Sequence, residues 1–212
     1  MAETTLSPGS SAIPLEGTPP PYMKLCVVTI GATAAFNTLI SEVMDERFFA
    51  KLYQAGFTHI IVQYGKAGKP IFDEFLEKHP FGHPGLHGIG IGGFELKPSL
   101  HPFFMMAKDR LDKDPPQKLG LVICHSGTGT ILEALRHGLP MIVVPNPDLA
   151  DNHQEDLARK IDQIKWGVMG KIGNVAAAID KADALRTREN EYEEESVDSM
   201  NSAMDDELSF VD

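Results

Sequence analysis

The chain has 212 residues, a net charge of −11 and 42% hydrophobic residues. This balance excludes a protein that binds nucleic acid through a basic surface, and the apolar content is enough for one packed domain. The acidity lies at the end of the chain, because residues 189–212 contain ten acids and no base, whereas residues 1–188 carry 20 acids and 19 bases. We therefore predict an acidic disordered tail at 189–212.

The two cysteines, Cys26 and Cys124, lie in apolar runs and have no Cys-x-x-Cys spacing. They are expected to be reduced core thiols in a cytosolic protein. The first residues show no basic region followed by an apolar one, and the least polar stretch, 25–40, is interrupted by polar residues. We expect neither a signal peptide nor a membrane span.

The elements follow in chain order after a leader at 1–22, which contains five prolines and is predicted to be disordered. Apolar runs predict strands at 25–30, 59–65, 86–94, 119–125 and 141–145, and helical spacing predicts helices at 36–56, 71–79, 128–138, 152–161 and 175–186. The segment 100–118 is expected to form a helix and a loop. This alternation predicts one α/β domain at 23–188, with a Rossmann-like, mostly parallel sheet, helices on both faces and an insertion at about 101–118.

The segment with the most chemistry follows the fourth predicted strand, where His125 precedes a turn that opens a helix. The amides of Gly127, Thr128, Gly129 and Thr130 are expected at the positive end of that helix, which suits a phosphate. Hydroxyl groups of the two threonines and the His125 imidazole can donate to the same anion. Glu133, one turn further, can accept from ribose hydroxyls, so the pattern suggests a nucleotide.

The same segment fits one other pattern and fails two more. Thr130-x-x-Glu133 also fits a capping box, in which Glu133 only bonds the amides of its own helix. There is no Gly-x-Ser-x-Gly around Ser126 and no P-loop lysine, so a hydrolase elbow and a P-loop are excluded. The turn at 31–36 lacks the glycines of a dinucleotide fingerprint, so an NAD site is not expected.

A second polar segment follows the fifth predicted strand and brings Asn152, His153 and Gln154 to the start of a helix. These groups can bond sugar hydroxyls, although Asn152 can also serve only as a helix cap. The spacing His79-x₃-His83-x₃-His87 would align three metal ligands on a helix, but the prolines and glycines between them exclude that helix. We predict a loop there, and no metal site.

These motifs carry a resemblance to known enzymes. His125-x-Gly-x-x-Thr130-x-x-Glu133, then Gly138-x-Pro140, resembles the donor-nucleotide signature of GT-B glycosyltransferases of family 28. More narrowly, VTIGAT (28–33), QYGK (63–66), FELKPSL (94–100), VICHSGTGTILEAL (122–135) and DNHQEDLA (151–158) resemble the catalytic, donor-binding subunits of the two-subunit UDP-GlcNAc transferase of dolichol-linked oligosaccharide synthesis. Leu139 and Gly120 depart from that pattern, which often has a basic and an acidic residue there.

The resemblance implies a role for each matching residue. His125, as the catalytic group, and the amides at 128–130 would hold the UDP diphosphate, over which Gly31 to Thr33 would close. Glu133 would bind the ribose, and the stretch from Phe94 through Leu96 to Lys97 would line the uracil. Asn152, His153 and Gln154 would bond the GlcNAc.

The resemblance also implies the reaction. An inverting transfer of GlcNAc from UDP-GlcNAc to dolichyl-diphosphate-GlcNAc, for protein N-glycosylation, would occur with a membrane-anchored acceptor-binding subunit at the cytosolic face of the endoplasmic reticulum. No Asp-x-Asp pair lies near the motifs, so no obligatory metal or other cofactor is expected. The alternative is a regulatory subunit that binds the nucleotide sugar without catalysis. The apolar face at 175–185 is proposed to contact the partner, unless it packs on its own sheet.

Overall fold

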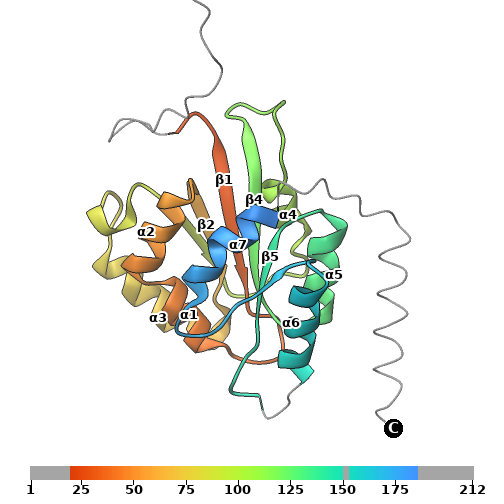
Figure 1. Ribbon diagram of the computed structural model, residues 1–212. Coiled ribbons are helices and arrows are strands. Elements are labelled where there is room, and N and C mark those ends of the chain that lie inside the picture. Colours follow the sequence, from red (N-terminus) through yellow and green to blue (C-terminus); the bar gives the residue numbers. More distant parts are fainter. Residues whose placement is uncertain (1–19, 150–152, 186–212) are drawn as a thin grey trace, which may run out of the picture.

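The structure is a computed structural model that describes residues 20–149 and 153–185. Most of the predicted leader, the predicted tail and Asn152 therefore lie outside the described residues. Figure 1 shows a central sheet with helices on both sides.

The sheet contains six strands in the order β3-β2-β1-β4-β5-β6, and every neighbouring pair is parallel. The prediction of a Rossmann-like parallel sheet is therefore confirmed. The strands are β1 (Met23–Thr29), β2 (His59–Gln63), β3 (Gly90–Phe94), β4 (Gln117–His125), β5 (Met141–Val144) and β6 (Val168–Met169). The two-residue strand β6 is too short to leave a recognisable pattern in the sequence.

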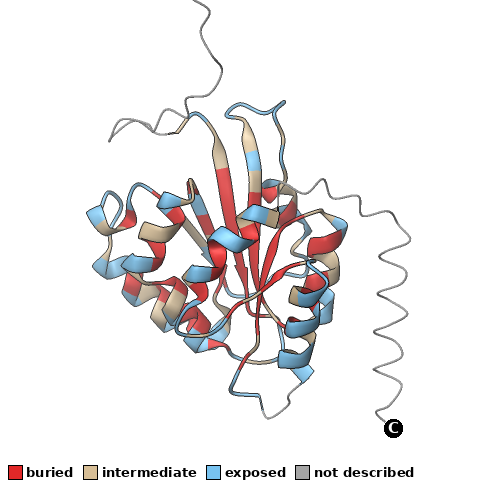
Figure 2. Cartoon of the chain, in the orientation of Figure 1, coloured by how far each residue is buried: buried red, intermediate tan, exposed pale blue. Residues whose placement is uncertain are grey.

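Helices cover both faces because alternate strand residues point in opposite directions. Cys26 and Val28 of β1 pack into one buried cluster, and Leu25 and Val27 pack into the other. Figure 2 shows that the buried residues gather in the strands of the sheet and in the helices beside them. The helices are α1 (Asn37–Val43), α2 (Glu46–Gln54), α3 (Gly65–Lys78), α4 (His101–Ala107), α5 (Thr128–Arg136), α6 (His153–Gln163) and α7 (Ile179–Ala184), with short 3₁₀ turns η1 (Pro84–Leu86) and η2 (Val175–Ala178). None of the described helices has the length and apolar character needed to cross a bilayer.

The helix predicted over 36–56 is in fact two helices. The chain leaves helical geometry at Met44 and extends at Asp45, whose carboxylate accepts the Arg47 amide and caps α2. Asp45 accepts a hydrogen bond from a backbone amide with its side chain. This bond replaces the continued helix and makes Asp45 the N-cap of a new one. Helix α3 is also longer than predicted, because Pro70 lies inside it rather than before it.

The segment 100–118 forms α4 and a loop, as expected. Phe104 and Ala107 of α4 are fully buried against β1 and β4, so the helix is part of the domain core. Gly120 follows in β4, where a register shift against β1 brings the strands close. A Cβ there would lie 2.2 Å from the Leu25 carbonyl oxygen, so this position requires glycine.

The apolar face at 175–185 packs on its own sheet. Val175, Ala178, Ile179 and Ala182 are buried in the same core cluster as β1 and β2. The proposal of a partner contact was therefore wrong for Ile179 and Ala182, because the domain itself already covers these side chains. For the other two residues of that proposal, the half-buried Ala176 and the exposed Ala177, it stays a prediction.

Candidate functional site: the carboxyl edge of the sheet

The predicted site residues of β1, β4 and β5 gather at the carboxyl edge of the sheet, the lower edge in Figure 1. In an open parallel sheet this is the edge where ligands bind, because loops and helix N-termini meet there. The crossing from β1 to β4 is the switch point, since β2 and β3 lie on one side of β1 and β4 on the other.

His125 ends β4 and lies between two glycines from different loops. A Cβ at Gly31 would lie 2.5 Å from the His125 Cε1, and one at Gly127 would lie 2.1 Å from its Nε2. Gly31 also has a φ of 76°, which side chains rarely adopt. The two glycines therefore form a slot for the imidazole, and the loop after β1 lies against the loop after β4.

Burial lowers the pKa of the His125 imidazole below its usual value. The ring is therefore neutral near pH 7 and offers one N–H donor and one acceptor. Its Nε2 faces Gly127, the N-cap of α5, where the backbone turns outward. The neutral imidazole can donate this one N–H to an anion bound beside it.

The N-terminus of α5 is open to a ligand. The helix begins at Thr128 after Gly127, no side chain caps it, and Thr128 and Gly129 are exposed. A Cβ at Gly129 would meet no atom within 4 Å. The free amides at 128–130 thus point into open space at the positive end of a nine-residue helix, which is the geometry that binds phosphate.

Three buried polar atoms at this edge have no hydrogen-bond partner within the described residues: Thr29 Oγ1, Gln63 Oε1 and His125 Nδ1. They belong to the last residues of the adjacent strands β1, β2 and β4. Buried polar atoms without partners are rare and point to a functional role. Sequence reasoning missed Thr29 and Gln63, although a polar residue at the end of an otherwise buried strand was the available signal.

Gln63 also fixes the loop after β1. Its side-chain amide donates to the Gly31 carbonyl oxygen at 3.1 Å, from a side chain that is 2% exposed. Gly31 is therefore held from both sides, by Gln63 and by the His125 ring.

Asn146 connects the other loops. Its side-chain amide donates to the Ala35 carbonyl oxygen at 3.0 Å, and its backbone amide donates to Gln154 Oε1 at 2.9 Å. The Ser126 hydroxyl donates to the Gln154 carbonyl oxygen at 2.6 Å. These bonds join the loops after β1, β4 and β5 to the start of α6, and they leave the side-chain amide nitrogen of Gln154 for a ligand.

Glu133 lies in the interior of α5 and is half-buried. The capping-box interpretation is excluded, because the helix starts two residues before Thr130 and no side chain caps it. The Glu133 carboxylate lies beside His101 and His137, whose rings share a 3.1 Å contact between Nδ1 and Nε2. The sequence did not point to these histidines, which belong to distant parts of the chain.

The remaining predicted residues are placed as follows. Phe94 is buried and stacks on Phe103, with ring centroids 4.5 Å apart, while Leu96 is 56% exposed. Thr33 is exposed in the loop after β1, and His153 is exposed at the first residue of α6. The structure therefore brings His125, Gly31 and the residues at 127–130 into one place. Phe94 ends β3 and Leu96 follows it at the same edge.

Comparisons with known proteins show which family this chain is similar to. The model of the "Glycosyltransferase family 28 C-terminal domain" matches residues 113–206. The UDP-N-acetylglucosamine transferase subunit ALG13 of Eremothecium gossypii is 32% identical over 172 residues, which cover 78% of this chain and 83% of that protein. The subunit of the same name from Kluyveromyces lactis is 32% identical over 178 residues, covering 74% and 85%.

Solved structures give the same result. The NMR solution structure of ALG13 has a TM-score of 0.54 at 25% identity, covering 79% of this chain and 87% of that one. The crystal structure of Acinetobacter baumannii MurG has a TM-score of 0.50 at 17% identity and is covered over 46% of its length, which supports the fold alone.

Fold and family model together define the class of the protein: a Rossmann-like domain equivalent to one half of a GT-B glycosyltransferase. Within that class, the chain belongs to the family of UDP-N-acetylglucosamine transferase subunits named ALG13.

Proposed function

We propose that this chain is the donor-binding, catalytic subunit of an inverting transferase that moves GlcNAc from UDP-GlcNAc to dolichyl-diphosphate-GlcNAc. The observation that carries the proposal is the placement of His125 in the slot between Gly31 and Gly127, next to the open N-terminus of α5. A diphosphate bound there would meet helix amides and a neutral imidazole donor.

In the proposed reaction, a hydroxyl of the lipid-linked sugar attacks the anomeric carbon of GlcNAc as the bond from that carbon to the β-phosphate oxygen breaks. Negative charge builds on the departing UDP. The amides at 128–130 and the His125 N–H are positioned to stabilise that charge, and one preorganised donor of this kind is typically worth about 2.7–4 kcal/mol. The acceptor proton needs a general base. We assign that base to the partner subunit.

The nucleoside and sugar are assigned to the neighbouring loops. Glu133 accepts from the ribose, the stretch from Phe94 to Leu96 lines the uracil, and the start of α6 with His153 and Gln154 contacts the GlcNAc. The family name describes the related proteins as subunits, which supports a partner. We propose that the partner is membrane-anchored, because the acceptor is a polyisoprenoid lipid, and that it recruits this chain to the cytosolic face of the endoplasmic reticulum. We further propose that transfer needs no metal.

Reconstitution with the membrane subunit tests the proposal. His125→Ala should lower kcat by about 10²–10³ with a smaller effect on the KM for UDP-GlcNAc, because the contact strengthens as UDP leaves. His87→Asn, which keeps the left-handed backbone at a distant position, is the control and should transfer at the wild-type rate.

Two results would contradict the proposal. Transfer by the complex that is independent of His125 would make this chain a regulatory subunit. A raised KM with unchanged kcat would make His125 an ordinary binding group.

A further inference from the structure

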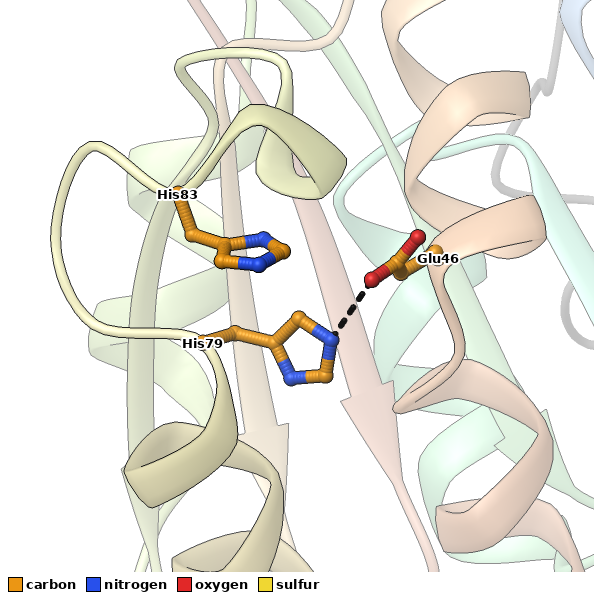
Figure 3. Close-up of side chains that lie close together, drawn as sticks. All are labelled: Glu46, His79 and His83. Atoms are coloured by element: carbon orange, nitrogen blue, oxygen red, sulfur yellow. Dashed lines mark hydrogen bonds and ion pairs between the residues drawn. The ribbon is translucent and has the colours of Figure 1, made fainter.

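A second polar cluster lies away from the carboxyl edge. It consists of Glu46 at the first residue of α2, His79 at the C-cap of α3 and His83 in the loop that follows (Figure 3). One ligand atom from each of the three side chains lies within 4.8 Å of the others. Because α3 returns from the carboxyl end of β2 toward the start of β3, the cluster is remote from the proposed donor site.

His79 faces two acceptors. Its Nδ1 lies 2.9 Å from the Phe75 carbonyl oxygen and its Nε2 lies 2.8 Å from Glu46 Oε1. A neutral imidazole has only one N–H. When Nδ1 donates to the carbonyl, the lone pair of Nε2 faces the carboxylate, and a cation between them would bind to both groups. A ligating histidine usually has this pattern, with its other nitrogen bonded to a backbone carbonyl.

The Glu46 carboxylate lies close to the Gly85 backbone. A Cβ at Gly85 would lie 2.5 Å from Glu46 Cδ, so a side chain there would push the carboxylate aside. The cations of the neighbouring pocket are already paired, since Arg47 contacts Asp45 at 3.0 Å and Lys78 contacts Glu74 at 2.6 Å. The charge of Glu46 is therefore directed at the imidazoles.

His83 must change its protonated nitrogen and its hydrogen bonding in order to bind an ion. Its Nδ1 accepts the Gly85 amide at 3.1 Å, and its ring meets the His79 ring edge-on with centroids 4.7 Å apart. To bind an ion through Nε2, His83 must move its ring proton to Nδ1 and give up the bond from Gly85. Its contribution to affinity should therefore be smaller than that of His79.

We propose that Glu46, His79 and His83 form a binding site for a divalent transition-metal ion of the zinc class, with water completing the coordination. Two imidazoles and one carboxylate are a donor set that Zn²⁺ accepts in tetrahedral geometry. The sequence spacing argued against a three-histidine helix, and there is none. The fold instead brings two of those histidines together with a carboxylate from a different helix. The ion would fasten the loop after α3 to the start of α2.

The test uses the full-length chain, stripped of metal by chelation, with zinc alone as the probe. Calorimetry should show one zinc ion per chain, and zinc should raise the Tm. His79→Ala should lower affinity by more than about 100-fold, exceeding the cost of losing a group that only orients a ligand. Glu46→Gln, which keeps the shape and removes the charge, should lower it by at least about tenfold, and His83→Ala by less than His79→Ala.

Matched controls use the other histidines. His87→Asn removes the third histidine of the sequence motif and should bind zinc like the wild type. His137→Ala disrupts the second group of possible ligands, formed by His101, Glu133 and His137, and should also leave the affinity unchanged. In the wild type, zinc should shift the ¹⁵N resonance of His79 Nε2, which requires no variant to fold.

The proposal is overturned by any of three results. One is the absence of zinc binding by the wild-type chain. Another is binding that His79→Ala leaves intact or that His137→Ala removes. The last is a His79 Nε2 resonance that zinc does not move. Because none of these results depends on transfer or on UDP, failure here is distinct from failure of the proposed reaction.

Discussion

The two ends of β1 differ in how their buried polar groups are paired. At the amino end, Lys24 is 4% exposed, and its Nζ donates to the Ala55 carbonyl oxygen at 2.6 Å and to Asp183 at 3.1 Å, and lies over the Phe57 ring. At the carboxyl end, Thr29 Oγ1 is buried without a partner in the described part of the chain. Pairing therefore stabilises the fold at one end, whereas the other end leaves a buried hydroxyl without a partner in the described residues.

The largest loss of stability is expected from a substitution just after the carboxyl end of β1. Gly31→Ala should lower the free energy of unfolding by about 3 kcal/mol, since a side chain at positive φ costs about 1–2 kcal/mol and overpacking against His125 adds about 1–3 kcal/mol. UDP affinity, measured by calorimetry, should fall with it.

Gly82→Ala is the matched control, because Gly82 has a φ of 84° and a Cβ there would meet nothing within 4 Å. Gly82→Ala should lower the free energy of unfolding only by the cost of a side chain at positive φ. The double variant Gly31→Ala/His125→Ala should recover part of the stability that Gly31→Ala loses. Additive losses at the two sites would contradict a slot in which Gly31 contacts the His125 ring.

The next largest loss of stability is expected at the amino end of β1. Lys24→Met should lower the free energy of unfolding by about 2–3 kcal/mol in urea denaturation, below the about 3–5 kcal/mol of a fully buried pair, because Asp183 is 36% exposed and can turn to water. UDP affinity should not change. Lys51→Met removes the exposed pair with Asp180 and should cost less than about 1 kcal/mol. Equal losses of the free energy of unfolding in Lys24→Met and Lys51→Met would mean that burial of Lys24 does not make its ion pair more stabilising.

A smaller effect is expected on UDP binding, with no change in the stability of the fold. Glu133→Ala should weaken UDP binding about tenfold, or about 1.5 kcal/mol for a partly buried charged hydrogen bond, and should leave the Tm near that of the wild type. Glu77→Ala, an exposed carboxylate on α3, should change neither quantity. Unchanged UDP affinity would remove Glu133 from the donor site.

The smallest effect is the pH dependence of stability. Burial lowers the pKa of His59 and His125, and burial with the nearby His101 and Lys108 lowers that of His137. The unfolded chain therefore binds more protons below about pH 6.5, so the free energy of unfolding should fall as pH drops through that value. His125→Gln should make this fall shallower in urea denaturation from about pH 7.5 to 5. A slope unchanged by His125→Gln would contradict the lowered pKa of the His125 imidazole.

The sequence predicted the parallel sheet because buried strands such as β4 and β5 are continuous apolar runs between glycines and prolines. It predicted the turn before α5 because Gly127 stands between a strand and a helix. It could not show that Gly31 contacts His125 or that Gln63 holds Gly31, since these contacts join distant residues. Glu46 was missed for the same reason, because its partners lie more than thirty positions away.

The borders of the sheet have a consequence for the protein in concentrated solution. Strand β6 has two residues, and β3 contains Gly90, Gly92 and Gly93 among its five. Long, flat edge strands template pairing with other chains, whereas short or glycine-rich ones offer few aligned amides and little side-chain surface. A second polypeptide therefore gains little by extending this sheet, and edge-to-edge aggregation is disfavoured by the same two strands.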